Sequence, residues 1–177
     1  MTTSSMHAKD RRLRVILITF LVVLTADQVS KAIVMALIEV DRPPDFDVFF
    51  QFTHQRNPGL VGGMFREVPA LAYVLPVFAT GILVYLYRFL DPKSIWQTLA
   101  FGMVFGGAVG NLIDRFRLGS VTDFLQVNFY FIPFDFPWKF YPAFNVADSS
   151  VCVGVAILVI TWNLAPPPEK SNVPGTV

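Results

Sequence analysis

Four long apolar stretches divide the chain, and each has enough residues to cross a bilayer as a helix, which takes about 20. They cover residues 13–38, 68–90, 94–113 and 144–164. Polar or proline-containing segments separate them. We therefore predict an all-α membrane protein with four transmembrane helices. The corresponding division is a cytoplasmic N-terminal tail (1–12), an integral membrane domain (13–165) and a C-terminal tail (166–177).

The first stretch follows a basic flank, an arrangement that also begins secretory signal peptides. No small-residue cleavage site follows it, and the apolar pattern resumes beyond Asp27 and Lys31. We therefore predict one uncleaved spanning helix here. Basic residues tend to remain on the cytoplasmic side. With four spans, both termini are then expected inside, and both long connections outside.

The two long connections carry strand and interface signals. Apolar and polar residues alternate over 46–54, which predicts a strand that ends at the Asn-Pro-Gly turn of 57–59. A weaker alternation over 121–131 predicts a second strand. Aromatic side chains then crowd residues 129–144, and such rings favour the membrane interface. We expect a small extracytoplasmic β-containing region and an aromatic-rich interfacial loop.

Composition supports a membrane protein and narrows the chemistry. Charged residues make up 15% of the chain and apolar residues 54%, whereas a soluble domain carries roughly 25% charged residues. A net charge of +1 gives no basic footprint for nucleic acid. The single Cys152 excludes a disulfide within the chain, and the distant His7 and His54 do not suggest a metal site. No metal or other cofactor is predicted.

Asp123 and Asp148 are the candidate catalytic groups. The topology places both at the outer side of the membrane, where ionisable groups are costly and usually functional. Two neighbouring carboxylates share one proton, so one can activate water while the other donates a proton. The simpler alternatives are that Asp148 only caps a helix and that Asp123 is a solvated loop residue. We favour the pair.

Other polar residues near the spans have open interpretations. Asp27 and Lys31 share a helix face, so a structural ion pair is favoured over substrate positioning. Asn111, Asp114 and Arg115 close the third span. They form either a helix-termination network or a brace in which Arg115 holds a carboxylate or a substrate carbonyl.

Small and amide residues complete the set of candidates. Asn57 lies in a predicted turn, and Asn145 precedes the fourth span as a possible cap. Glycines at spacings of four let another helix approach closely. The glycines of the third span are Gly102, Gly106, Gly107 and Gly110.

Two functions of other classes also fit an apolar chain with intramembrane charges. One is a small transporter or proton-coupled channel, although no internal repeat is evident. Its relay groups would be Asp27, Lys31, Asp114 and Asp148. The other is a non-catalytic membrane assembly factor.

Sequence blocks spread along the chain resemble those of the bacterial lipoprotein signal peptidases, or signal peptidase II. The blocks are DQVSK at 27–31, NPG at 57–59, GAVGNLIDR at 107–115, GSVTDF at 119–124 and FNVAD at 144–148. The resemblance extends over about residues 13 to 165. Long, ordered blocks of this kind are specific to the family.

The resemblance implies an aspartyl endopeptidase of the bacterial inner membrane, with its active site near the periplasmic face. Such an enzyme removes signal peptides from prolipoproteins before a diacylglyceryl-modified cysteine. It implies Asp123 and Asp148 as the catalytic pair, and membrane lipid and globomycin-type cyclic peptides as further partners. Residues implied to line or support the substrate site are Asn57, Gly59, Asn111, Arg115 and Asn145. Residues implied to have a structural role are Asp27, Lys31, Asp114, Gly107 and Gly110.

One block departs from the family pattern. After N-x-G the family usually has a small residue and then phenylalanine, whereas Gly62 stands at that phenylalanine position here. We expect this loop to shape the substrate pocket differently. The difference concerns fine specificity and inhibitor contacts and leaves the acid pair unchanged.

Overall fold

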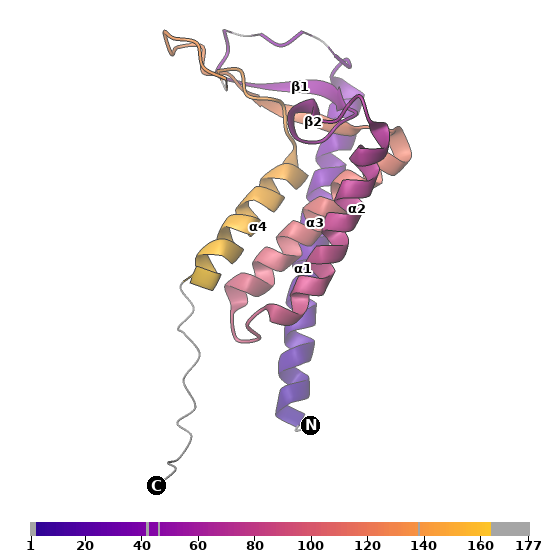
Figure 1. The fold of residues 1–177 in the computed structure, drawn as a ribbon, viewed down its shortest axis with the longest axis vertical. Coiled ribbons are helices and arrows are strands. Elements are labelled where there is room, and N and C mark those ends of the chain that lie inside the picture. Colours follow the sequence, from indigo (N-terminus) through magenta and orange to yellow (C-terminus); the bar gives the residue numbers. More distant parts are fainter. Residues whose placement is uncertain (1–2, 42, 46, 138, 164–177) are drawn as a thin grey trace.

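Helices run side by side along the computed structural model, and a small sheet lies across one end of them (Figure 1). The structure describes residues 3–41, 43–45, 47–137 and 139–163. The α-helices are α1 (Thr3–Leu37), α2 (Pro69–Leu86), α3 (Ile95–Leu118) and α4 (Val146–Asn163). The strands are β1 (Phe50–Asn57) and β2 (Val121–Val127), and the short 3₁₀ helices are η1 (Val61–Gly63) and η2 (Tyr87–Phe89). The predicted tail 166–177 lies outside the described residues.

Helix α3 is the central helix and packs against the other three. Its glycines allow this close approach, as their spacing predicts. A Cβ added at Gly102 would lie 2.8 Å from the Cβ of Thr19 on α1. On the opposite side, a Cβ added to Gly154 of α4 would lie 2.6 Å from a methyl group of Val104. Glycine therefore sets the helix separations here.

The ends of α3 follow from its sequence. The predicted cap Ser94 is confirmed, because its side chain accepts a hydrogen bond of 3.2 Å from the N–H of Gln97. The helix continues past residue 113 to Leu118 and stops at Gly119, whose φ of 72° is left-handed. Only glycine adopts that conformation without strain, so the C-terminal end is fixed there.

Three helical segments are long and apolar enough to cross a membrane: Asp10–Leu37, Pro69–Phe89 and Val146–Asn163. They leave many large apolar side chains exposed, such as Leu17 and Phe78, as lipid-facing surfaces do. These features identify a membrane protein. Among the described helices, α3 is not one of these apolar segments, although it is long enough to cross a membrane. Because other helices surround it, it needs less lipid-facing surface.

The predicted β-region is confirmed as a two-stranded antiparallel sheet in which Gln55 pairs with Asp123 and Asn57 with Val121. The expected first strand began at Phe46, which lies outside the described residues. The observed strand runs from Phe50 to the turn at 57. Within the strand, a bulge between Phe52 and Gln55 leaves the two consecutive residues Thr53 and His54 buried, which breaks the expected period of two.

Strand β2 ends at Val127, short of the predicted 131. The next side chain, that of Asn128, is buried and donates to the carbonyls of Asp45 and Val48, both at 3.1 Å. These bonds tie the chain to the loop before β1. After Asn128, residues 129–137 of the aromatic segment extend away from the helices (Figure 1), and Phe134 is 65% exposed.

Candidate active site

Asp123 and Asp148 come from different elements and meet at one side chain. Strand β2 places Asp123, and the first turn of α4 places Asp148. Between them, Asn145 Nδ2 donates to Asp123 Oδ1 at 2.8 Å. The N–H of Asp148 donates to Asn145 Oδ1 at 2.9 Å. The structure therefore brings the two predicted carboxylates into one network.

Asn145 is also the N-cap of α4, as its position predicts. Its side chain accepts from the N–H of Asp148, and Asp148 Oδ2 accepts from the N–H of Asn145 at 3.1 Å. This reciprocal arrangement is a capping box. The cap role proposed as the simple alternative for Asp148 is thus present. It occupies one carboxylate oxygen and leaves Oδ1 for Asn111.

Asp123 is almost fully buried, with 4% of its surface exposed. Its Oδ2 accepts a hydrogen bond of 3.0 Å from Asn57 Nδ2, in addition to the bond from Asn145. Burial, followed by the negative charge of Asp148, raises the pKa of Asp123 to about 7, against the opposing effect of these amide donors. A carboxyl group with this pKa can hold or release a proton near neutral pH.

Asn111 connects the acid pair to the helix bundle. Its Nδ2 donates to Asp148 Oδ1 at 2.8 Å. Its Oδ1 accepts from Lys31 Nζ at 2.9 Å and from Asn145 Nδ2 at 3.1 Å. With two donors on the oxygen, the amide can present only its nitrogen to Asp148.

A buried charge triad lies behind this network. Lys31 Nζ is 2.8 Å from Asp27 Oδ2 and 3.2 Å from Asp114 Oδ2, so the predicted Asp27–Lys31 ion pair is confirmed. Asp27 Oδ1 accepts from the N–H of Ala147, and Asp114 Oδ2 from the N–H of Thr122, both at 3.0 Å. Each acidic member thus holds the backbone immediately before one of the paired aspartates.

Arg115 supports the turn that follows β1. Its Nη2 donates to the carbonyl of Gly59 at 2.9 Å, and its Nη1 to the carbonyl of Asn111 at 3.4 Å. No described carboxylate lies within ion-pair distance of it. Of the two open interpretations, the bond to the Asn111 carbonyl fits the helix-termination network, and the bond to Gly59 ties that helix end to the turn. A contact of Arg115 with a substrate carbonyl stays a prediction. Asn57 closes the same turn through bonds to Leu60 and Gly59.

The structural glycines lie where α3 meets the site. A Cβ at Gly107 would collide with the carbonyl oxygen of Ala147, and one at Gly110 would lie 2.6 Å from Asp27 Oδ2. Larger residues at either position would displace the start of α4 or the Asp27 carboxylate. Every residue that the sequence singled out for the site therefore belongs to the network or packs against it.

Sequence reasoning missed two residues of this network. Gln28 Nε2 donates to Asp27 Oδ2 at 3.1 Å and to Asp114 Oδ1 at 3.3 Å. Thr122 is fully buried and accepts a bond of 3.3 Å from Asn145 through its carbonyl. Gln28 belongs to the DQVSK block, which was the available signal. Thr122 lies in the GSVTDF block, but its N–H and carbonyl make the bonds to this network, and a residue type does not reveal backbone bonds.

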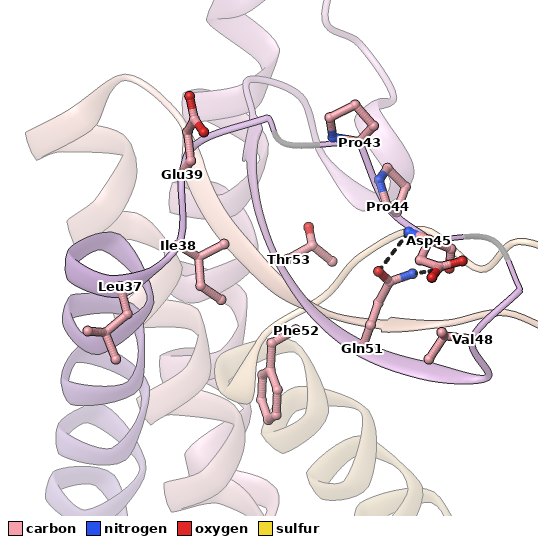
Figure 2. A pocket seen from close by; sticks show the side chains of 10 residues that line it. All are labelled: Leu37, Ile38, Glu39, Pro43, Pro44, Asp45, Val48, Gln51, Phe52 and Thr53. Carbon is pink, nitrogen blue, oxygen red and sulfur yellow. Dashed lines mark hydrogen bonds between the residues drawn. The ribbon is translucent and has the colours of Figure 1, made fainter.

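A cavity of about 360 Å³ lies apart from the acid pair, between the end of α1 and β1 (Figure 2). Its rim is held by two bonds between Asp45 and Gln51: the N–H of Asp45 donates to Gln51 Oε1, and Gln51 Nε2 donates to the Asp45 carbonyl. None of its lining residues belongs to the network described above. The geometry therefore points to the acid pair as the candidate site.

Sequence comparisons connect this geometry to known proteins. Residues 19–164 match the family model described as Signal peptidase (SPase) II. A lipoprotein signal peptidase of Syntrophotalea carbinolica is 35% identical over 159 residues, which cover 86% of this chain and 92% of that protein. One of Shewanella loihica is 39% identical over 148 residues, which cover 78% and 79%.

The fold has solved relatives as well. One bacterial membrane enzyme superposes with a TM-score of 0.66 at 27% identity, covering 88% of this chain and 94% of its own. A second structure of a bacterial membrane enzyme gives a TM-score of 0.65, also at 27% identity.

Proposed function

The chain belongs to the signal peptidase II family, whose members remove signal peptides from prolipoproteins, and from this premise we propose that Asp123 and Asp148 are its catalytic pair. The chain is a bacterial membrane protease, and with two catalytic aspartates it would be an aspartic protease. The observation that carries the proposal is the bridging side chain of Asn145. It donates to the carboxyl group of Asp123 and accepts a hydrogen bond from the backbone N–H of Asp148. This bridge holds two acidic groups close together in a buried site.

The two carboxyl groups divide the chemistry by sharing one proton. Below about pH 7, Asp123 keeps the proton, because burial and the charge of Asp148 raise its pKa to that value. Asp148, at the positive end of the α4 dipole, is the ionised partner. It takes a proton from water as the water oxygen attacks the scissile carbonyl. Asp123 gives its proton to the carbonyl oxygen as it becomes negative.

Collapse of the resulting tetrahedral intermediate completes the hydrolysis. The C–N bond breaks, and the proton held by Asp148 passes to the departing amine. The proton on the intermediate's hydroxyl returns to Asp123. Both carboxyl groups then recover their starting states, so no other reactant than water is consumed.

The proposed substrate is a prolipoprotein cut before its diacylglyceryl-modified cysteine. A lipid-anchored peptide reaches its protease sideways from the bilayer, so the acid pair has to lie at membrane depth. The turn held by Asn57, Gly59 and Arg115 covers Asp123 and is the proposed wall of the peptide site. Globomycin-type cyclic peptides would occupy the same space, with Gly62 altering the contacts of this wall.

The proposed topology has four spans, with α3 as the third, and both termini in the cytoplasm. The basic flank before α1 supports this orientation. The described end of α4 and the start of α1 lie at the same end of the molecule, and the sheet at the other (Figure 1). The acid pair would then face the periplasm of the inner membrane. The aromatic segment 129–144 would lie on the membrane surface.

Cleavage of a lipidated precursor by the purified protein tests the catalytic pair. Asp123→Asn and Asp148→Asn are expected to abolish cleavage while still folding, as shown by a cooperative thermal unfolding transition. Asp91→Asn, at the opposite end of the bundle, serves as the matched control and should cleave normally. Full activity in either active-site variant would overturn the acid-pair mechanism. Solute or proton flux into liposomes without proteolysis would favour a transporter instead.

A further inference from the structure

Lys31 has one hydrogen bond that ion pairing does not explain. Its ammonium group offers three N–H donors, and three acceptors surround it. Two are the carboxylates of Asp27 and Asp114, at 2.8 and 3.2 Å. The third is the neutral amide oxygen of Asn111, at 2.9 Å. Because Lys31 is only 1% exposed, water does not compete for this donor.

We propose that Lys31 is a positioning residue for the acid pair, acting through the amide of Asn111. This inference rests on the proposed catalytic role of Asp123 and Asp148. Lys31 holds the oxygen of Asn111, so the nitrogen of the same amide faces Asp148. Its positive charge also favours an ionised carboxylate within the pair.

The orientation follows from donors and acceptors. If the Asn111 amide were reversed, its N–H group would face the ammonium of Lys31, and its oxygen would face the carboxylate of Asp148. Both contacts would be repulsive. Lys31 therefore selects the one amide orientation that donates a 2.8 Å bond to Asp148. Asn145 donates to the same oxygen at a longer 3.1 Å and reinforces the choice.

The positive charge of Lys31 acts on the acid pair alongside several other charged groups. The charge of Lys31 lowers the pKa of Asp123, opposing burial and the charge of Asp148. Charged groups near the pair come from three elements: Lys31 and Asp27 on α1, Arg56 on β1, which donates to Thr122 Oγ1, and Asp114 and Arg115 on α3. Lys31 is the member of this set whose hydrogen bonds lead through Asn111 to Asp148.

A purely structural role for Lys31 is the competing explanation. Removing Lys31 alone leaves Asp27 and Asp114 buried without a counter-ion, which destabilises a protein strongly. The double variant Asp27→Asn/Lys31→Met reduces this cost, because it leaves one buried carboxylate instead of two. That carboxylate, Asp114, keeps the hydrogen bonds from Gln28 Nε2 and from the N–H of Thr122. The amide introduced at position 27 keeps an oxygen that can accept the N–H of Ala147. This variant separates stability from the action on the acid pair.

The experiment measures the pH dependence of kcat and KM for the full-length protein with a lipidated precursor. In the double variant, we expect a cooperative thermal transition at a lower temperature than in the wild type but above that of the Lys31→Met single variant, so the assay is run below it. We expect kcat to fall about 10-fold or more with little change in KM, because the lost bond acts on the reacting groups. The alkaline limb of the pH profile should move up by a few tenths of a unit, because the lost cation of Lys31 outweighs the lost anion of Asp27, whose charge opposed it.

Two further variants sharpen the result. Lys31→Arg keeps the charge and should keep the alkaline limb in place, while its different geometry lowers kcat. Lys93→Met, at the cytoplasmic end, removes a lysine outside the network and should change neither quantity. A folded double variant with an unchanged kcat and pH profile would overturn the proposal for Lys31. Activity in Asp123→Asn would instead overturn the catalytic pair, so the two failures are distinguishable.

Discussion

The side chain of Asn145 donates a 2.8 Å hydrogen bond to Asp123 while it caps the helix that carries Asp148. One residue therefore fixes both the start of α4 and the relation between the two acidic groups. The stability of the helix and the geometry of the site are coupled through a single amide. Substitutions that keep one role and remove the other can test them separately.

Asn145→Ser is the first such substitution. Serine is a good N-cap, so the free energy of unfolding of the variant should stay within about 1 kcal/mol of the wild-type value. Its side chain is too short to reach Asp123 as well, so kcat/KM should fall by roughly 100-fold through misplacement of the pair. Asn145→Ala should lose both properties. Thermal unfolding and precursor cleavage measure the two effects, and an active Asn145→Ser enzyme would show that the bridge is dispensable.

Activity should depend on pH through Asp123. The mechanism needs this group protonated, and its pKa lies at about 7. As the pH rises through that value the proton is lost, both carboxylates become negative, and kcat/KM should fall about tenfold per pH unit. A profile of kcat/KM between pH 5 and pH 9 measures this limb. Constant activity up to pH 9 would contradict the assignment of the proton to Asp123.

Stability should respond to pH with a defined sign. The pKa of Asp123 is raised from 3.8 in an ordinary environment to about 7 in the folded protein. The contribution of Asp123 to the stability of the fold is therefore fully present below pH 3.8, and it is lost as the pH rises through 7. Asp123→Asn stays neutral, so it should unfold at least about 3 °C above the wild type at pH 8. At pH 4 the two proteins should unfold together.

The glycines of α3 give a prediction about packing. Gly107→Ala and Gly110→Ala should each lower stability by about 1–3 kcal/mol, because the added methyl group meets the Ala147 carbonyl or the Asp27 carboxylate. Gly81 of α2 is the matched control, since a Cβ there meets no atom within 4 Å. Gly81→Ala should be neutral or slightly stabilising. Unchanged or raised stability in all three variants would show that helix propensity, rather than contact, decides.

The sequence predicted the helices and strands better than their ends and the contacts between them. Apolar runs located the helices because burial and lipid contact impose them over many residues. The capping residue Ser94 and the close-packing glycines carried equally local signals. The end of α3 was placed too early, although a local glycine, Gly119, marks it, and the bulge in β1 was not predicted because tertiary pairing decides it. The backbone donor of Thr122 was invisible for the same reason.

The site illustrates the same division. The motif blocks named Asp27, Lys31 and Asn111, yet residues in separate blocks gave no sign that a lysine would bond to an amide facing Asp148. Such a relationship depends on how α1, α3 and α4 cross. The sequence therefore predicted which side chains take part, and the structure supplied the order in which they contact one another.

Gly62 gives a last prediction, about the loop that departs from the family pattern. Its backbone is left-handed, with φ 61° and ψ 23°, while a Cβ there would lie 3.4 Å from Pro142, an ordinary contact. Backbone strain rather than space therefore excludes larger residues. Gly62→Ala should cost about 1–2 kcal/mol locally and raise KM several-fold, because the loop next to Asn57 and Asp123 changes shape. Asparagine tolerates this conformation better, so Gly62→Asn should keep a KM near the wild-type value. Equal KM values for the two variants would contradict control of this wall by backbone strain at position 62.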